Sequence, residues 1–448
     1  MDTTRDFTSG PIMGPLIRFS LPILAALFLQ ALYGAVDLLV VGKYAVTADV
    51  SGVAIGSQIM MTVTGLISSL AMGSTILLGQ KLGMRAEKDC GGVIGTGIAF
   101  FGLVGLALTL LLPGLSSALA GLMNAPEEAF RETRLYIAVC GGGSLAIVAY
   151  NVLGSVMRGL GDSRTPLMTV AVACAVNIAG DLLLVAVFHL GAAGAAAATV
   201  AAQLISVLVS FLVLRRRGLP FPFSRRDIRL DGRFLRPMLR FGAPIALQDV
   251  LVSLSFLVIL SIANSLGLAA SAGVGVAEKV CGFIMLTPAA FMQAMSAYVA
   301  QNHGAGKDDR AIRGLRIAIA LSTAFGLGMF YLAFFHGDLL CGIFARDENV
   351  ILAGADYLKA YAIDCLFTCF LFCFIGFYNG LGYTGFVSVQ GVAAFLIRIP
   401  VSILMRRVLG TLFGIGLGVP VATVFQILAC FLFLWHLKRK RLLKQSAA

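Results

Sequence analysis

Charged residues are scarce in this sequence. Only 12% of its 448 residues are Asp, Glu, Lys or Arg, and 59% are hydrophobic. Charged residues make up about 25% of a typical soluble domain, which needs them to cover its surface. Disorder is excluded as well, because disordered chains are poor in apolar side chains. The composition therefore predicts a protein that crosses a membrane several times.

Motifs for catalysis and for nucleotide or metal binding are also missing. The sequence has no Gly-x-x-x-x-Gly-Lys-Ser/Thr phosphate loop and no His-Glu-x-x-His pair, and its four histidines do not cluster. Cys365, Cys369 and Cys373 share one helix face, which allows a metal or redox site but is more typical of small packing residues. These absences argue against an ATP-driven pump and against an enzyme, and they predict no cofactor.

Long apolar runs are what the sequence has in abundance. A membrane-spanning helix needs roughly 17–25 apolar residues. The chain has twelve such runs, which predict an all-α fold of twelve transmembrane helices. They cover residues 14–42, 52–80, 91–113, 129–156, 165–189, 193–214, 237–263, 272–300, 313–335, 353–379, 386–405 and 411–435.

The basic residues indicate how these helices are oriented. With the spans in place, 25 Lys and Arg lie on the side of both termini and 7 on the opposite side. Cytoplasmic loops are enriched in Lys and Arg, so both termini are expected in the cytoplasm. The net charge of +12 then reflects topology, and we expect no binding to nucleic acid.

The two halves of the chain resemble each other at a nearly constant offset. Pro22 matches Pro244 at an offset of 222, and the segment Gly159-Leu160-Gly161 matches Gly380-Leu381-Gly382 at 221. Six spans per half give both halves the same orientation, related by a pseudo-two-fold axis along the membrane normal. This arrangement is typical of alternating-access transporters, although an inert gene duplication would leave the same pattern.

The repeat divides the chain into three parts. An Arg-rich polar stretch, residues 215–236, separates the two groups of spans. The predicted organisation is an N-lobe of residues 1–214, a cytoplasmic linker of residues 215–236 and a C-lobe of residues 237–448.

Ionisable side chains inside the spans are costly and are therefore functional candidates. They are Asp37, Asp181, Asp249, Glu278, Lys279, Asp364 and Arg398. At 1.5 Å per residue, polar side chains of four first-half spans lie at a similar level, roughly 9–12 Å from the outer ends of the spans. These are Asp37, Tyr136, Asn177, Asp181 and Thr199.

Oxygen-rich groups of this kind suit a proton or a hard monovalent cation. We therefore predict a site for H⁺ or Na⁺ in the first half. The alternative is that these groups only hydrogen-bond between helices. In the second half, Asp249 and Asp364 are placed near mid-membrane, where they either hold a cation or a cationic substrate or neutralise Arg398 or Lys279.

Several motifs together resemble one transporter family. They are the segment from Val36 to Gly42 after Tyr33, Asn177-x-x-x-Asp181, Arg158-Gly-Leu-Gly-Asp-Ser-Arg-Thr-Pro166 and the loop from Gln301 to Arg310. Their combination is similar to the multidrug and toxic compound extrusion (MATE) transporters of bacteria, over nearly the whole chain. Tyr383 departs from the pattern, since many members have an acid there.

The resemblance implies a monomeric antiporter in the bacterial inner membrane that exports small organic cations in exchange for H⁺ or Na⁺. The residues it assigns to the coupling cation are Asp37, Asn177, Asp181 and Thr199. Those it places around the substrate are Tyr33, Tyr136, Asn151, Asp249, Asp364, Glu278 and Arg398. The alternative is a lipid-linked saccharide flippase of a related fold, although such a protein would favour cationic residues over the acids found here.

Overall fold

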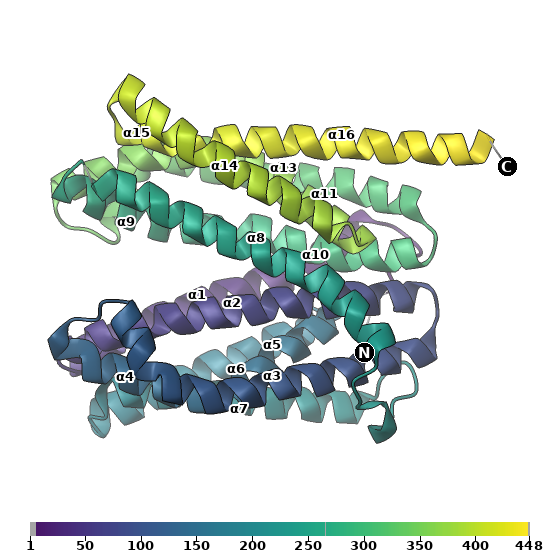
Figure 1. Ribbon diagram of the computed structural model, residues 1–448, viewed down its shortest axis with the longest axis horizontal. Helices are drawn as coiled ribbons and strands as arrows, with labels where there is room; N and C mark the ends of the chain where they lie inside the picture. The colour runs from purple at the N-terminus through teal and green to yellow at the C-terminus, as the bar shows by residue number, and fades with distance from the viewer. Residues whose placement is uncertain (1–5, 265, 447–448) are drawn as a thin grey trace. The chain divides into compact units, whose positions relative to one another are not determined.

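The computed structural model describes residues 6–264 and 266–446, and these residues form helices joined by short connections (Figure 1). Arg5, counted above among the basic residues on the side of the termini, lies outside the described residues. Helices dominate because the backbone of a lipid-exposed segment must form its hydrogen bonds internally.

The first half of the chain contains seven α-helices and one π-helical turn among the described residues. They are α1 (Met13–Tyr44), α2 (Thr47–Gly83), α3 (Glu87–Leu122), α4 (Glu127–Gly142), α5 (Ser144–Gly159), α6 (Arg164–Asp181), η1 (Leu182–Val187) and α7 (Gly191–Arg217).

The second half begins after a short 3₁₀ turn, η2 (Arg225–Asp227), and contains nine α-helices in its described part. They are α8 (Gly232–Asn264), α9 (Leu268–Ile284), α10 (Leu286–Gly304), α11 (Asp308–Phe335), α12 (Gly337–Gly342), α13 (Glu348–Leu381), α14 (Thr384–Leu409), α15 (Leu412–Gly416) and α16 (Gly418–Ser446).

The expected twelve spans are present. In the described residues, eleven helices are long and apolar enough to cross a membrane, and α4 with α5 makes a twelfth that is bent by 57°. The sequence predicted one continuous run over residues 129–156, whereas the helix breaks at Gly143. A Cβ atom at Gly143 would overlap the side chain of Val200, so the break lies where α7 packs closely against this span.

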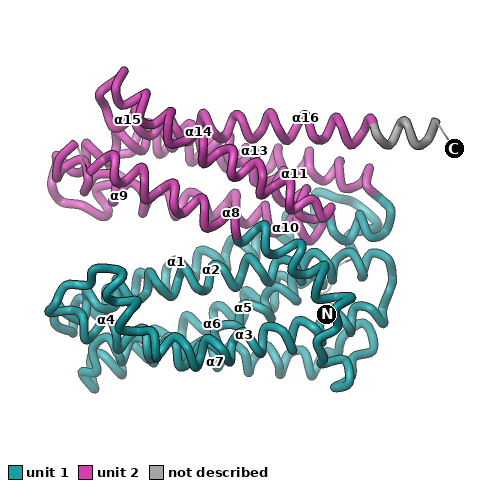
Figure 2. Tube along the Cα trace, in the orientation of Figure 1, with its two compact units in different colours: residues 1–246, 300–307 teal, residues 247–299, 308–448 magenta. Residues whose placement is uncertain are grey.

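The chain divides into two compact units, coloured separately in Figure 2. The first comprises residues 1–246 and 300–307, and the second comprises residues 247–299 and 308–448. The first unit thus includes the start of α8 and the end of α10. In the second unit, α13 packs against α9, α11 and α16 and supplies much of the buried core.

The segment between the two sequence halves is docked rather than free. Phe221 and Phe234 are buried in the same apolar cluster as Cys90 and Val93 of α3. A Cβ at Gly92 would overlap the Phe234 ring, so this glycine lets the segment approach α3 closely. The linker therefore belongs to the packing of the first unit.

The Gly-Asp loop after α5 shapes the start of α6. Gly161 has a positive φ of 78°, which favours glycine. The Asp162 carboxylate accepts hydrogen bonds from the backbone N–H groups of Arg164 and Thr165, both at 3.0 Å, and pairs with Arg217 at 3.6 Å. The corresponding Gly382 also has a positive φ, whereas Tyr383 provides no side-chain cap for α14.

A reciprocal glycine contact joins α2 to the last part of α10 inside the first unit. A Cβ at Gly83 would overlap the carbonyl oxygen of Gln301, and a Cβ at Gly304 would overlap that of Gln80. The four residues form two pairs at the repeat offset of 221. The two helices can cross this closely only because both contact positions lack a side chain.

Candidate ion and substrate site

Asp37 and Asp181 form the centre of a buried polar cluster in the first unit. Asp37 lies on α1, Asp181 is the last residue of α6, and their side chains are 6% and 0% exposed. The two carboxyl groups lie close enough to share a hydrogen bond. Among the described residues, neither Asp181 oxygen nor Asp37 Oδ1 has a hydrogen-bond donor. A proton or a small cation between the two carboxyl groups would satisfy these oxygens.

Asn177, Thr199 and Tyr136 complete the cluster. Asn177 lies one turn before Asp181 and donates a hydrogen bond to Thr199 Oγ1 on α7 at 3.4 Å, while its own Oδ1 has no donor among the described groups. The buried Tyr136 ring of α4 lies near Asp37 and Thr199. The structure thus brings together the five side chains that the depth estimate had placed at one level.

Local backbone features position these groups. The helix changes to a π-helical turn immediately after Asp181, and such turns are common at functional sites. On α2, a Cβ at Gly56 would overlap the Tyr136 ring. The missing side chain at Gly56 therefore leaves the space that the ring occupies.

Tyr33, which the resemblance placed around the substrate, is half-buried and lies near Asp37. Its other two polar neighbours, Tyr150 and Gln203, were not identified from the sequence. Gln203 is buried on α7, and its Oε1 has no donor among the described residues. The signal was present, because Gln203 follows Thr199 by four residues and therefore shares its helix face. Tyr150 accepts a hydrogen bond from Gln30 at 3.0 Å.

Asn151 is engaged in a different set of contacts. Its Nδ2 donates to the Ile147 carbonyl oxygen and its Oδ1 accepts from Ser68 Oγ, each at 2.8 Å. The first bond lies within α5, and the second joins α5 to α2. They give Asn151 a bridging role between two helices.

The second unit contains a different buried cluster, centred on Asp364 of α13 and Arg398 of α14. Asp364 Oδ2 accepts a hydrogen bond from Thr368 at 2.8 Å, and its Oδ1 has no donor among the described groups. Arg398 donates to Ser255 Oγ at 2.5 Å and lies over the Phe256 ring at 5.1 Å. Arg398 is within electrostatic range of Asp364. A buried cation and a buried carboxylate therefore face one region.

Aromatic and acidic groups surround this second cluster. Tyr357 and Tyr361 of α13 are buried and lie within electrostatic range of Arg398 and Glu278. Their ring centroids are 5.4 Å apart, and the two rings are tilted by 47° to each other. Glu278 is half-buried, and its Oε1 has no hydrogen-bond donor in the described part of the chain. Asp249 differs from them because its side chain is exposed.

The ligand chemistry of the first cluster suits a small monovalent ion. Its donors are carboxylate, amide and hydroxyl oxygens, which hard cations and protons prefer. No group of three His, Cys, Asp or Glu side chains able to hold a metal occurs among the described residues. The nine cysteines are all buried free thiols, including the three on one face of α13.

Twelve apolar spans in two units, each with a buried polar cluster, define a multi-pass membrane protein of the transporter class. The MatE family model matches residues 22–183 and 244–404, two stretches that start 222 residues apart and together exceed half of the chain. The chain therefore belongs to the multidrug and toxic compound extrusion family, whose members are multidrug efflux transporters rather than enzymes.

Individual relatives cover nearly the whole chain. The probable multidrug resistance protein YpnP of Bacillus subtilis is 28% identical over 96% of both chains. The probable multidrug resistance protein NorM of Thermotoga maritima is 23% identical over 93% of this chain and 91% of its own. A solved MATE family transporter in an outward-facing conformation has the same fold, with a TM-score of 0.90 over 98% of this chain and 99% of its own, at 18% identity.

Proposed function

We propose that this protein is a secondary active antiporter that exports small organic cations in exchange for H⁺ or Na⁺. The observation that carries the proposal is the buried Asp37–Asp181 pair, in which both Asp181 oxygens and Asp37 Oδ1 have no hydrogen-bond donor among the described residues. Two adjacent carboxylates in a low-dielectric site repel each other. One proton or one Na⁺ removes that repulsion. The pair therefore binds a cation from whichever side of the membrane has access to the site.

Coupling follows from the competition between this cation and the substrate. Asn177 and Thr199 supply neutral oxygens beside the pair, and Tyr136 and Tyr33 line it with aromatic rings. An organic cation would be attracted to the same carboxylates and would stack on the same rings. Loading of H⁺ or Na⁺ therefore favours release of the drug, and loss of the ion favours its binding.

The second cluster offers its own set of groups that could bind an organic cation. Asp364 and Glu278 supply negative charge, and Phe256, Tyr357 and Tyr361 supply aromatic surface. Flat, positively charged organic molecules combine the two features that these side chains recognise.

We further propose that both termini and the linker lie in the cytoplasm and that the protein acts as a monomer in the bacterial inner membrane. The support is the distribution of 25 basic residues on one side against 7 on the other. A rocking motion of two lobes joined by residues 215–236 would expose the sites alternately.

Dye transport by inverted membrane vesicles tests this function. A cationic dye should accumulate in vesicles that contain the protein when either a proton gradient or a sodium gradient is imposed, and the effective gradient identifies the coupling ion. Dye transport whose rate depends on neither gradient would contradict antiport. Movement of a phosphate-linked saccharide lipid in its place would favour the flippase alternative, which the buried cationic Arg398 supports.

A further inference from the structure

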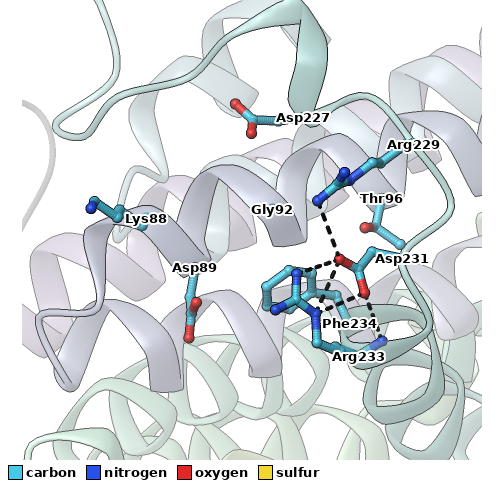
Figure 3. Close-up of a pocket in the computed structure, with 9 residues that line it drawn as sticks. All are labelled: Lys88, Asp89, Gly92, Thr96, Asp227, Arg229, Asp231, Arg233 and Phe234. Carbon is cyan, nitrogen blue, oxygen red and sulfur yellow. Dashed lines mark hydrogen bonds and ion pairs between the residues drawn. The ribbon is translucent and has the colours of Figure 1, made fainter.

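A second polar site lies far from these clusters in sequence, where the linker packs against the start of α3. A pocket of ≈ 220 Å³ opens there (Figure 3). Its lining residues are Lys88, Asp89, Gly92, Thr96, Asp227, Arg229, Asp231, Arg233 and Phe234. All of them belong to the first unit.

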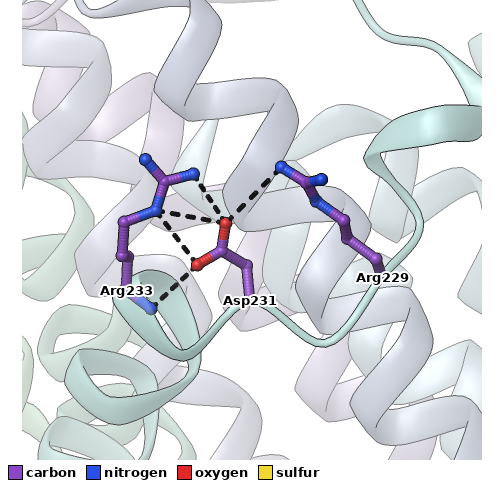
Figure 4. A network of polar contacts seen from close by, with 3 residues as sticks. All are labelled: Arg229, Asp231 and Arg233. Carbon is purple, nitrogen blue, oxygen red and sulfur yellow. Dashed lines mark hydrogen bonds and ion pairs between the residues drawn. The ribbon is translucent and has the colours of Figure 1, made fainter.

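Each acid of this pocket already has a partner. Asp89 pairs with Lys81 at 2.8 Å, and Asp227 Oδ2 accepts from the backbone N–H of Ser224 at 2.7 Å. Asp231 accepts three bonds from the Arg233 side chain, from Nη2 to Oδ2 at 2.7 Å and from Nε to Oδ1 at 3.1 Å and to Oδ2 at 3.2 Å (Figure 4). These hydrogen bonds lower the pKa of Asp231 to about 2, so the pair remains charged at neutral pH.

The cationic side chains of the pocket make fewer ionic contacts than its acids do. Lys88 has no ionic partner among the described side chains. Arg229 reaches Asp231 only at 3.8 Å, and its side chain remains 68% exposed. The surrounding stretch, residues 215–236, has eight arginines against two aspartates. With Lys81, which pairs with Asp89, four cationic side chains stand against the three acids that line the pocket, so the balance of charge is positive and suits an anion.

Thr96 provides an independent indication of a ligand. Its side chain is 0% exposed and lines the pocket, yet its hydroxyl has no hydrogen-bond partner among the described groups. Buried hydroxyl groups nearly always have such a partner. An acceptor oxygen on a molecule in the pocket would supply it.

The apolar residues around the pocket indicate a lipid. Phe223, Ile228 and Leu230 of the linker are exposed among the arginines, a pattern typical of segments at a membrane interface. Deeper along α3, Leu103, Leu106 and Leu110 form an exposed apolar row that would face acyl chains. A headgroup in the pocket would thus continue into hydrocarbon along the same helix.

We propose that Lys88, Arg229, Arg233 and Thr96 bind the phosphate of an anionic glycerophospholipid in the cytoplasmic leaflet. This site rests on the cytoplasmic placement of the linker proposed above, and it involves neither the coupling pair nor the substrate cluster. Lipid bound here would fasten the linker to α3, since the pocket is lined by both.

Lipid binding by the purified full-length protein in detergent tests the site. Native mass spectrometry counts retained lipid, and thermal stabilisation gives the lipid concentration for half-maximal effect. Short-chain phosphatidylglycerol is the probe, with phosphatidylcholine of the same chains, inorganic phosphate and glycerol 3-phosphate as comparisons. We expect saturable binding of phosphatidylglycerol only.

Two double variants separate the pocket from general charge. Lys88→Gln with Arg229→Gln should raise the half-maximal concentration about tenfold, the effect of losing charge-assisted hydrogen bonds. Arg225→Gln with Arg226→Gln removes the same charge from the linker outside the pocket and should change it by less than about twofold in a neutral micelle. An equal loss of lipid affinity in both double variants would overturn the proposed site, because it would show that only the general basic charge of the surface binds the lipid.

Thr96→Val supplies a test that does not depend on charge. The substitution keeps the shape of the side chain, so the lipid-free protein should be as stable as before or slightly more so, because a buried unpaired hydroxyl is removed. Phosphatidylglycerol retention should fall. Unchanged retention in this variant, equal binding of phosphatidylcholine or equal competition by inorganic phosphate would each overturn the proposal. The assay needs no ion gradient, so its failure leaves the antiport proposal standing.

Discussion

At the scale of single residues, the decisive feature is the unsatisfied hydrogen bonding between Asp37 and Asp181. Both side chains are buried, and as two carboxylates they offer only acceptors to each other. A buried acceptor without a donor costs free energy, and a buried pair of like charges costs more. A bound proton or cation would remove this cost, which is the property that the proposed coupling site requires.

The first prediction is that Asp37→Asn and Asp181→Asn each abolish gradient-driven efflux. Asn is nearly the size of Asp, so packing should survive, but its amide cannot bind and release a proton near neutral pH. It also removes one charge from a sodium site. The measurement is dye efflux by cells or vesicles with matched amounts of each variant in the membrane.

Asp249→Asn and Asp364→Asn are the comparisons for this experiment. Asp249 is exposed, so its variant should retain more transport than either variant of the pair. Normal efflux by both variants of the pair, with loss in Asp249→Asn or Asp364→Asn, would move the coupling site to the second half. Normal efflux by all four would rule out carboxylate coupling.

The second prediction concerns the packing of the Tyr136 ring against Gly56. Gly56→Ala should displace the aromatic ring from the cluster and reduce transport severalfold, because the added methyl would overlap the base of the ring and not only its tip. Gly65 lies on the same helix with no atom within 4 Å of an added Cβ. Gly65→Ala should therefore transport normally and be slightly more stable, by up to about 1 kcal/mol. Equal transport by both variants would show that the ring position is unimportant.

Helix geometry explains which site residues could be predicted from the sequence and which could not. Counting residues from a span end gives the depth of a side chain, and this was sufficient to bring Asp37, Asp181 and Thr199 together. Depth does not tell which way a helix is rotated toward its neighbours. Gln203 was not singled out although it lies one turn deeper than Thr199 on the same helix face, and Asp249, which was placed near mid-membrane from its depth, has an exposed side chain.

At the scale of helices, small residues decide where two elements approach closely. The break in the fourth span shows the limit of hydropathy, because residues 135–156 are largely apolar on both sides of the bend, while a Cβ at Gly143 would overlap the Val200 side chain at the break. The packing of the linker also could not be predicted from its composition. Its composition is polar and Arg-rich, yet Phe221 and Phe234 bury it against α3, since two aromatic anchors are enough to dock a short segment.

The third prediction tests the reciprocal contact between α2 and α10. Gly83→Ala or Gly304→Ala should force the two helix ends apart, because the added methyl would meet a backbone carbonyl that cannot move alone. Overpacking of this kind costs about 1–3 kcal/mol. The measurement is the thermal unfolding midpoint of the purified protein, which should fall for both variants.

Gly102→Ala is the matched control for this contact. Gly102 lies within α3, and a Cβ there would meet no atom within 4 Å. Its variant should unfold at the same temperature as the parent protein or slightly higher. If the Gly83 and Gly304 variants behave like the control, the helix ends are not held by this contact.

At the scale of the whole molecule, the duplicated sequence carries two different chemistries. The family model matches twice at the same offset that the sequence repeat gave. The counterparts of Asn177 and Asp181 at offset 221 are nevertheless Arg398 and Ser402. Ser402 donates to the Ile415 carbonyl oxygen at 2.8 Å and serves packing, while Arg398 brings a cation. The repeat therefore predicts the fold of the second half but not the chemistry of its site.

The fourth prediction is the orientation of the chain in the membrane. A single cysteine introduced by Asn349→Cys, at the exposed start of α13, should react with a membrane-impermeant maleimide added to intact cells. One introduced by Arg225→Cys, in the exposed linker, should react only after the membrane is permeabilised. The nine native cysteines are all buried, so their background labelling should be low.

The parent protein without an added cysteine sets that background in both conditions. The expected pattern follows from the excess of basic residues on the side of the linker, 25 against 7, because basic loops are retained in the cytoplasm during insertion. The reverse pattern, with Arg225→Cys labelled in intact cells, would place the linker outside. It would also remove the lipid site at Lys88 and Arg229 from the cytoplasmic leaflet, and it would reverse the direction in which the Asp37–Asp181 pair exchanges its cation for substrate.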